Sequence, residues 1–485
     1  MSKLIKTSKL NFLKKVIRNI LTGMKKINTF KGRQYFVKML CLVGLLGLGC
    51  KGDPISPDNE EEDNDLVYID KSCSSCDFVI TSDQTGFDGI AKGVEPGDTI
   101  GIASGTRGSL YLSNIIGTED KPVVIMNCDG HVESGTSKDE GYGISIIESE
   151  HFIITGTGDT NSKYGIGLRG YMGMALQGKS TNFEVEAVEV LETGYAGIIA
   201  RSDPTCDGEI SRSTFTQYNT IIHDNYVHNT GGEGIYIGGS HWSEGWDGDA
   251  GCPGTVLSEP ELKGVRVYNN IINNTGRDGF QVGSAVEDCE LHHNSVSNYG
   301  LAGDYGHLNG IQLGPGTTGT VYNNVVVDGG GGYGIAIFGR GDVTAFNNLI
   351  INPGAGIGTF MRDPTPGLGF YVMNNTIINP KEDGVAIFDN ETVGTVFFNN
   401  IIVNPVGEFF ISYVGQIEID SANNYLTYDI NELMFKDIAN LDYSLKDGSP
   451  AIDAGKDVSS YHIDFDITGA KRPVNEYDIG AYEKQ

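Results

Sequence analysis

Apolar and polar residues alternate in short runs along most of this chain, and the runs recur at a regular spacing. From about residue 220 to residue 425, an asparagine before an apolar pair returns every 24 to 30 residues, with one longer gap of 45. After most copies a glycine opens a short alternating segment, as at 234–237, 279–282, 310–313, 334–337 and 384–387. Alternation with a period of two predicts short β-strands that turn one face inward.

This repeat unit has the length of one coil of a solenoid. One coil alone cannot bury its apolar face, whereas a stack of coils can. We expect the asparagine at a turn between strands, where its side chain can bond its own backbone and the asparagines of neighbouring coils. The recurring positions are Asn225, Asn270, Asn294, Asn324, Asn348, Asn375, Asn400 and Asn424.

With these repeats, residues 78–485 resemble the right-handed parallel β-helix proteins of the pectate-lyase-like superfold, which carry PbH1-type repeats. The resemblance implies an all-β, single-stranded right-handed parallel β-helix with loop insertions and a C-terminal cap. It implies a fold more than an activity, because this superfold hosts lyases, hydrolases, epimerases, adhesins and plain binding proteins. The expected divisions are a signal segment (1–49), an acidic tether (50–76), the β-helix (77–430) and a capping segment (431–485).

The capping segment resembles the closing segment of bacterial β-helix surface proteins. It contains several acids and Arg472. A solenoid needs a polar cover for its last coil, so a structural role is favoured over a catalytic one. We expect Arg472 to pair with one of these carboxylates.

The N-terminal region indicates export. Its first 40 residues carry 11 Lys or Arg and no Asp or Glu, and an apolar stretch then runs to Cys50. The ending Leu48-Gly49-Cys50 resembles a bacterial lipobox, although Gly47 departs from the usual leucine. It implies a lipidated Cys50. The acidic run at 59–65 resembles that of surface-exposed outer-membrane lipoproteins of Bacteroidota-type bacteria, with an ordinary linker as the alternative.

Charge narrows the class of partner. Without residues 1–49 the chain keeps 23 Lys and Arg against 63 Asp and Glu, a formal charge of −40. Such a protein repels nucleic acid and anionic membranes. It suits Ca²⁺ or neutral sugars, and an anionic polymer would need a local basic patch or a bridging cation. The pattern leaves the oligomeric state open.

Cysteine usage is compatible with disulfides in an exported protein. Cys73 and Cys76 form one isolated CxxC, without the second pair that a zinc site would need. A local disulfide between them is the favoured interpretation. Cys206 and Cys252 lie in two insertions and are expected to join them.

Departures from the repeat point to the chemistry. Two insertions stand out: 238–253, which holds both tryptophans, and 300–307. Insertions in a solenoid form loops over one face, often the binding face. Trp242 and Trp246 are candidates for stacking on sugar rings, and the alternative is that they cover apolar surface under a loop.

Aligning the coils places acids side by side. Glu233 and Asp278 each precede a strand glycine in adjacent coils, so their backbones should lie about 4.8 Å apart. Arg277 and His307 flank them, and a groove is expected above the outward strand residues. The candidate catalytic residues are Asp278, Arg277, His307, Glu233 and Arg340. The candidate substrate-binding residues are Tyr236, Gln281, Gln312, His241, Trp242, Trp246 and Tyr305.

Three roles are open for the two carboxylates. They could be the acid and base of a glycoside hydrolase, ligands of Ca²⁺, or turn residues, since Asp383-Gly384 repeats the pattern. A lyase must neutralise a uronate carboxylate and remove a neighbouring proton. Arg277 or Ca²⁺ could neutralise the charge. His307, Tyr305 or Arg340 could take or relay the proton.

The sequence therefore predicts an exported polysaccharide-processing protein, in first place a polysaccharide lyase acting on an acidic glycan. A glycoside hydrolase using Glu233 and Asp278 is one alternative. A non-catalytic glycan-binding or adhesive surface protein is the other. The paired Asp and Gly-His-Gly signatures of pectin hydrolases and the Asp-Pro-His motif of alginate epimerases are not found.

Overall fold

The computed structural model describes residues 66–485, apart from 140, 248–251, 361, 363–364, 366–367, 389–393 and 415–419. The predicted export signal, Cys50 and most of the acidic tether lie outside the described residues. The larger of two compact units, residues 53–435 and 444–485, contains the solenoid. In the smaller unit the described residues are 436–443. Among the described residues, no helix has the length and apolar character needed to cross a membrane.

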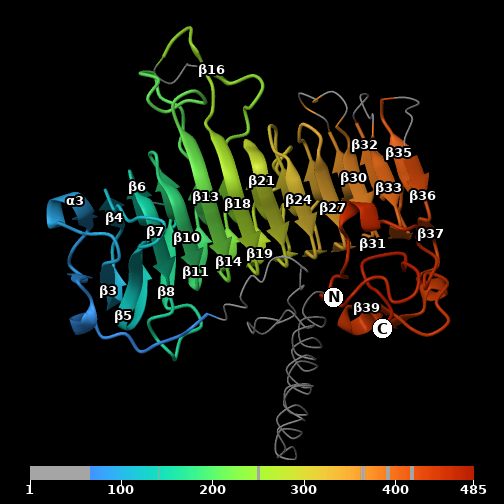
Figure 1. Ribbon diagram of the computed structural model, residues 1–485, viewed down its shortest axis with the longest axis horizontal. Coiled ribbons are helices and arrows are strands. Elements are labelled where there is room, and N and C mark those ends of the chain that lie inside the picture. The colour runs from blue at the N-terminus through green and yellow to red at the C-terminus, as the bar shows by residue number, and fades with distance from the viewer. Residues whose placement is uncertain are drawn as a thin grey trace, which may run out of the picture. The chain divides into compact units, whose positions relative to one another are not determined.

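The solenoid is built from three rows of parallel strands. Figure 1 shows strands of successive coils side by side in chain order, from blue to red. The first row contains β1 (Phe78–Ile80), β3 (Thr99–Arg107), β5 (Val123–Ser134), β7 (Glu150–Thr155), β10 (Thr181–Glu186), β13 (Thr216–His223), β18 (Glu261–Tyr268), β21 (Ala285–His292), β24 (Gly319–Tyr322), β27 (Val343–Phe346), β30 (Phe370–Met373), β33 (Val396–Phe398) and β36 (Asp420–Ala422).

The second row follows the first after a tight turn. It contains β8 (Ile166–Gly170), β11 (Val188–Thr193), β14 (Tyr226–Thr230), β19 (Ile271–Thr275), β22 (Ser295–Ser297), β25 (Val325–Val327), β28 (Leu349–Ile351), β31 (Thr376–Ile378), β34 (Ile401–Val403) and β37 (Tyr425–Thr427). These two rows are joined into one sheet by the long strand β5, which pairs with both β7 and β8.

The third row is a separate 12-stranded sheet. It contains β2 (Gly86–Asp88), β4 (Leu110–Ser113), β6 (Tyr142–Ile147), β9 (Met172–Gln177), β12 (Ile198–Ala200), β15 (Ile235–Ile237), β20 (Phe280–Val282), β23 (Ile311–Leu313), β26 (Tyr333–Ile337), β29 (Ala355–Thr359), β32 (Val385–Ile387) and β35 (Phe410–Ser412).

The remaining elements are short: η1 (Cys73–Ser75), α3 (Gly89–Lys92), β16 (Trp246–Asp247), β17 (Val256–Leu257), η3 (Ile430–Leu433), β38 (Phe435–Asp437), η4 (Ile438–Asn440), β39 (Asp442–Leu445) and η5 (Ser459–Tyr461).

Inward side chains of all three rows form one continuous apolar core. It runs from Ile80 in the first coil to Ile402 near the last, and both are fully buried. Because each strand contributes alternate residues, neighbouring coils stack like on like, as with Ile235, Phe280 and Ile311. The structure confirms the predicted all-β parallel β-helix.

The asparagine column forms a buried ladder at the turn between the first and second rows. Asn324 accepts from the backbone and side-chain amides of Asn294, both at 3.0 Å. Its own side-chain nitrogen donates to Leu291 O, Tyr322 O and Asn348 Oδ1. The left-handed backbone conformation at this turn belongs to the residue before the column asparagine, such as Asn323 with φ 53°.

The closing segment packs along the side of the last coils. Arg472 is 1% exposed and pairs with Glu483 at 2.9 Å, which confirms the predicted carboxylate partner. Arg472 also donates to Asn347 Oδ1, and the backbone of the segment bonds the turn residues Asn374 and Asn399. The predicted start of this segment at residue 431 stays a prediction.

Outward residues of the first row change character where the closing segment covers them. Phe346, Met373 and Phe398 lie in one buried cluster with apolar residues of that segment. In earlier coils the same column holds His223 and Tyr268, whose rings stack at 4.5 Å. Outward residues of this row are therefore apolar where the closing segment covers them.

His223 is a buried cation in this column. Its ring nitrogens lie 2.8 Å from Asp224 and from Glu184, and Glu186 is 3.5 Å away. Burial alone would lower the pKa of His223, but the hydrogen bonds to Asp224 and Glu184 outweigh it and raise this pKa to about 9.

We expect His223 to make the free energy of unfolding fall as the pH rises through the alkaline range. A folded-state pKa above the unfolded value stabilises the protein fully below about pH 6.5, and this contribution is lost as pH rises through about 9. The expected loss is on the order of 2 kcal/mol of unfolding free energy. Urea unfolding at pH 7 and at pH 9.5 measures it, and His223→Gln should remove most of the difference. An equal pH effect in wild type and variant would contradict this account.

The disulfides match one expectation and correct another. Cys206 and Cys252 are bonded, so the loop around Cys206 is joined to the insertion 238–253 as predicted. Cys73 bonds Cys128, not Cys76, so the predicted local CxxC disulfide is wrong. The physical reason is that η1 places Cys73 against the strand that carries Cys128, where Asp129 also accepts the Cys73 N–H at 3.2 Å.

Candidate functional site

Three adjacent coils of the third row position the candidate acids. The strands β15, β20 and β23 pair in register through Ile235, Phe280 and Ile311. Two positions before these residues lie Glu233, Asp278 and Asn309, respectively. Gly234 N donates to Asp278 O at 3.0 Å, so Glu233 and Asp278 are neighbours in the stack as predicted.

The two acids and the two residues predicted to flank them lie close together. His307 Nδ1 lies 3.5 Å from Glu233 Oε1 and 3.7 Å from Asp278 Oδ2. Arg277 Nη1 lies 3.5 Å from the same Glu233 oxygen. We call Glu233, Asp278, Arg277 and His307 the acid–histidine cluster.

Burial divides the cluster into an inner and an outer layer. The side chains of Glu233 and Asp278 are 0% exposed, whereas those of Arg277 and His307 are 30% and 36% exposed. An incoming molecule would therefore meet the guanidinium and the imidazole first. The two carboxylates lie beneath these groups and can affect a bound molecule through them.

The electrostatics of the cluster follow from this layering. Burial raises the pKa of Asp278 to about 6, although the His307 ring and the Asn309 N–H, 2.6 Å from Oδ1, lower it. The Asp278 carboxylate beside it raises the pKa of His307 above its ordinary value. The imidazole thus turns Nδ1 toward two buried acids, and the Asp278 carboxylate makes it more basic.

Several buried polar atoms of the cluster have no hydrogen-bond partner among the described residues. They are Glu233 Oε2, Asp278 Oδ2, His307 Nδ1 and, next to them in the stack, Gln281 Oε1. An unsatisfied buried polar group costs about 1–3 kcal/mol, so folds rarely keep several together without a functional reason.

Asp383 shows what the same column looks like when its role is structural. It precedes a strand glycine, as Asp278 does, and is 8% exposed. Its carboxylate accepts from Glu408 N at 2.8 Å and from Tyr413 Oη at 2.7 Å. Both carboxylate oxygens of Asp383 are thus satisfied. Asp278 accepts the equivalent backbone bond through Oδ1, from Asn309 N, but its Oδ2 has no hydrogen-bond partner among the described residues.

The expected open groove floor is wrong. Tyr236, Gln281 and Gln312 point outward from the third row but are only 4%, 1% and 6% exposed. Arg201 lies 4.9 Å from the Tyr236 ring, and the Tyr236 hydroxyl bonds Ser240. Arg201 and Ser240, which contact Tyr236, lie between strands, in segments whose position the repeat alone does not determine.

The tryptophans hold the insertion together. Trp242 is 8% exposed, and its ring lies 3.5 Å from the Arg212 guanidinium and 5.7 Å from that of Arg340. The prediction that Trp242 is an exposed sugar platform is therefore wrong. Trp246 is half-buried and donates from Nε1 to Glu259 at 2.5 Å. The His241 ring, 46% exposed, lies 5.1 Å from the Trp246 ring.

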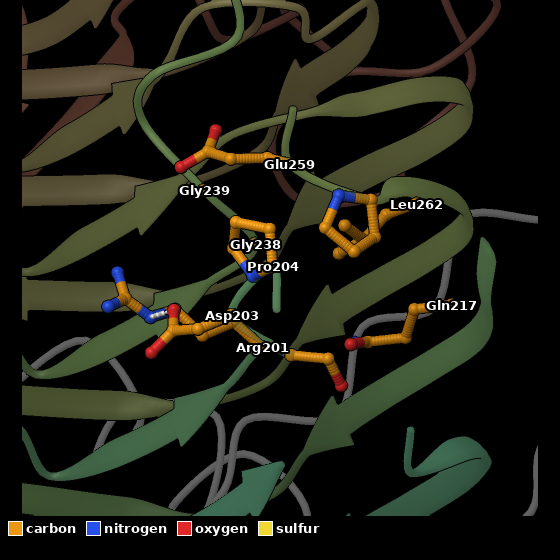
Figure 2. Close-up of a pocket in the computed structure, with 10 residues that line it drawn as sticks. Arg201, Asp203, Pro204, Gln217, Gly238, Gly239, Glu259 and Leu262 are labelled. Carbon is orange, nitrogen blue, oxygen red and sulfur yellow. Dashed lines mark ion pairs between the residues drawn. The ribbon is translucent and has the colours of Figure 1, made fainter. Parts of the chain in front are cut away.

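Glu259 is the anchor of this insertion. It is 2% exposed and accepts from His241 N and Ser284 Oγ as well as from Trp246. Figure 2 shows it across a small pocket from the ion pair of Arg201 with Asp203. Sequence reasoning missed Glu259, and its one signal was an acid before Pro260, shortly after the insertion.

Two other predicted residues lie apart from the acids. Arg340 packs near Trp242, which follows β15, whereas Glu233 precedes that strand. The structure thus does not bring Arg340 into the acid–histidine cluster. Tyr305 is 99% exposed on the loop that carries His307. Asp304, which was not predicted, accepts from Arg277 Nε at 2.9 Å.

Among the described residues, two groups of side chains are close enough to hold a cation: Glu184, Glu186 and His223, and Glu233, Asp278 and His307. In the first, both ring nitrogens of His223 already bind carboxylates. In the second, Arg277 and His307 approach the same Glu233 oxygen. Ca²⁺ takes six to eight oxygen ligands. Glu233 and Asp278 offer two oxygens without a hydrogen-bond partner among the described residues, which is far fewer than this ion needs.

Comparison with known proteins gives information about the fold alone. No protein-family model and no curated protein matches the chain. Among solved structures, pectate lyase Pel9A is 15% identical with a TM-score of 0.49, over 81% of this chain and 90% of that one. The PL6 family polysaccharide lyase Pedsa3628 from Pseudopedobacter saltans is 13% identical with a TM-score of 0.39, over 76% and 96%. An alginate lyase from Paenibacillus sp. str. FPU-7 is 15% identical with a TM-score of 0.33, over 72% and 95%.

Proposed function

We propose that this protein is a polysaccharide lyase that cleaves an acidic glycan at the acid–histidine cluster. One observation carries the proposal: His307 turns Nδ1 toward two fully buried carboxylates while more than a third of its side chain faces solvent beside Arg277. Carboxylates that face Nδ1 favour the proton on that nitrogen, which leaves the other nitrogen, Nε2, as the proton acceptor.

The chemistry assigned to these residues is β-elimination. The Arg277 guanidinium binds the uronate carboxylate and neutralises its charge, which makes the neighbouring C–H bond more acidic. His307 Nε2 takes that proton, and the electron pair becomes the new C=C bond. The glycosidic oxygen leaves and takes its proton from water. Asp278 and Glu233 stabilise the imidazolium that forms.

Local charge supports an anionic substrate despite the acidic chain. The guanidinium of Arg277 is a permanent cation, is 30% exposed and lies beside the buried acids. It forms the local basic patch that an anionic polymer needs on a protein of this net charge, while His307 beside it acts as the base in its neutral form.

A glycoside hydrolase remains the second candidate function because the possible ligand atoms of Glu233 and Asp278 lie within 4.8 Å of each other. Retaining enzymes place their two carboxyl groups roughly 5–5.5 Å apart. The burial of both acids opposes this role, since a nucleophile or general acid must touch the glycosidic bond.

A panel of polysaccharides tests the proposal. The purified protein is incubated with acidic and neutral glycans, and ultraviolet absorbance and reducing ends are followed together. New absorbance with new reducing ends supports a lyase, and reducing ends alone support the hydrolase. Neither signal, with retention on an immobilised glycan, would indicate a non-catalytic binding protein.

We expect the activity to be independent of Ca²⁺. The donor set of the cluster does not fit this ion, so EDTA should leave the initial rate within about twofold of the untreated enzyme. Added Ca²⁺ should not increase the rate. Loss of more than nine-tenths of the rate on chelation, restored by Ca²⁺, would contradict the assignment of charge neutralisation to Arg277.

A further inference from the structure

We propose that Asp304 occupies the place of the substrate carboxylate on Arg277, and that the loop 300–307 releases Arg277 when an acidic glycan binds. The inference rests on the proposed function, because that function gives Arg277 the uronate carboxylate as its ligand. It assigns Asp304 the role of an internal competitor that an incoming uronate carboxylate must displace from Arg277.

The contacts of Arg277 carry the first step. Its Nε donates to Asp304 Oδ2 at 2.9 Å, while its Nη1 lies 3.5 Å from Glu233 and its plane lies near the Tyr195 ring. The Asp304 side chain is 49% exposed. A guanidinium binds carboxylates through its planar N–H groups, so a loop carboxylate and a uronate compete for the same donors.

The backbone of the loop carries the second step. Its base is tied to the coil below, because Gly300, Leu301 and Ala302 donate to backbone oxygens of residues 275–277 at 2.8 to 3.1 Å. The tip, 303–306, bonds only within the loop through its backbone, at Gly303 N and Asp304 O. Among the described residues, the side chain of Asp304 supplies the ion pair that holds the tip to the solenoid.

Two glycines with open space beside them border the exposed residues of the tip. Gly303 and Gly306 have φ of 75° and 87°, and a Cβ at either position would meet nothing within 4 Å. Exposed ion pairs are weak, so breaking the Asp304–Arg277 pair is a small barrier to opening. Tyr305, 99% exposed between these glycines, would move with Asp304 and offers an aromatic face for a sugar ring.

This arrangement predicts competition for Arg277. An acidic glycan brings a carboxylate that replaces Asp304 on Arg277, and the displaced tip then gains contact with the glycan. A neutral glycan has no carboxylate to exchange for Asp304, so its binding does not depend on the release of Arg277.

Calorimetric titration of Asp304→Asn tests the inference. The probes are oligogalacturonate, oligoalginate and hyaluronan oligosaccharides, each beside its carboxyl methyl ester. We expect the variant to bind the acidic probe that wild type binds about two- to fivefold more tightly, with unchanged binding of the ester. On that polymer KM should fall by the same factor with kcat unchanged. Asp288→Asn is the matched control, because it breaks a comparable exposed pair with Arg266 on the first row.

The outcomes separate the two proposals. If wild type cleaves an acidic polymer and Asp304→Asn binds it no more tightly, the role of Asp304 is overturned and the lyase stands. A fall in kcat would show that Asp304 positions His307 instead of competing with substrate, which also overturns it. If neither protein binds any acidic probe, both proposals fail. Tighter binding without turnover in either protein would keep the competition and overturn the lyase.

Discussion

Asn324→Ala is expected to lower the free energy of unfolding by about 4 kcal/mol. The side chain is 0% exposed and links three coils of the ladder, accepting from Asn294 and donating to Asn348. Alanine removes these bonds and leaves the Leu291 and Tyr322 carbonyls without this donor. Each buried polar group left unsatisfied costs about 1–3 kcal/mol, and the loss of several together accounts for the size of the effect.

Urea unfolding followed by circular dichroism measures this change, with calorimetry to check that the solenoid unfolds in one step. Asn273→Ala is the control. Asn273 is only part-buried and makes one side-chain bond, to Ser297 at 2.7 Å, so its loss should cost less than about 1 kcal/mol. A similar small cost for Asn324→Ala would show that the ladder does not hold the coils together.

The second large effect is expected on turnover. His307→Ala should reduce kcat by about 10²- to 10⁴-fold, the range that a general base contributes. Asp278→Asn should reduce it as well, because the amide keeps the shape but removes the charge that stabilises the imidazolium. It should also shift the pH profile. Since the Asp278 carboxylate raises the pKa of His307, its removal lowers that pKa and moves the rising limb of kcat to lower pH.

Asp383→Asn is the matched control for Asp278→Asn, since both aspartates precede a strand glycine in the same column. Asp383 bonds Glu408 N and Tyr413 Oη, away from the cluster, so its variant should lose some stability and keep the wild-type kcat. Wild-type turnover in His307→Ala, or an equal loss in Asp383→Asn, would contradict the assignment of the site.

The repeat made the fold and the register of the site predictable. A fixed spacing of asparagines and strand glycines determines which residues of neighbouring coils lie side by side, because stacked parallel strands align like positions. This is why Glu233 and Asp278 could be paired from sequence. Arg277 and His307 followed because each lies within two residues of a strand glycine or of a residue that precedes one.

The predictions that failed depend on contacts outside the repeat. Trp242 is buried because Arg212, from a different insertion, covers its ring, and no periodic pattern places those loops against each other. The same holds for Tyr236, which Arg201 covers. The disulfide of Cys73 joins the entry segment to β5, a partner 55 residues away that the short CxxC spacing concealed.

The central claim is that the acid–histidine cluster cleaves an acidic glycan by β-elimination. Mass spectrometry of the products formed in ¹⁸O-labelled water tests it most directly. The account predicts fragments whose new non-reducing ends lack one molecule of water relative to a saturated sugar, with no oxygen incorporated from the solvent on cleavage. Saturated fragments that carry one labelled oxygen would contradict it, since they would show hydrolysis instead.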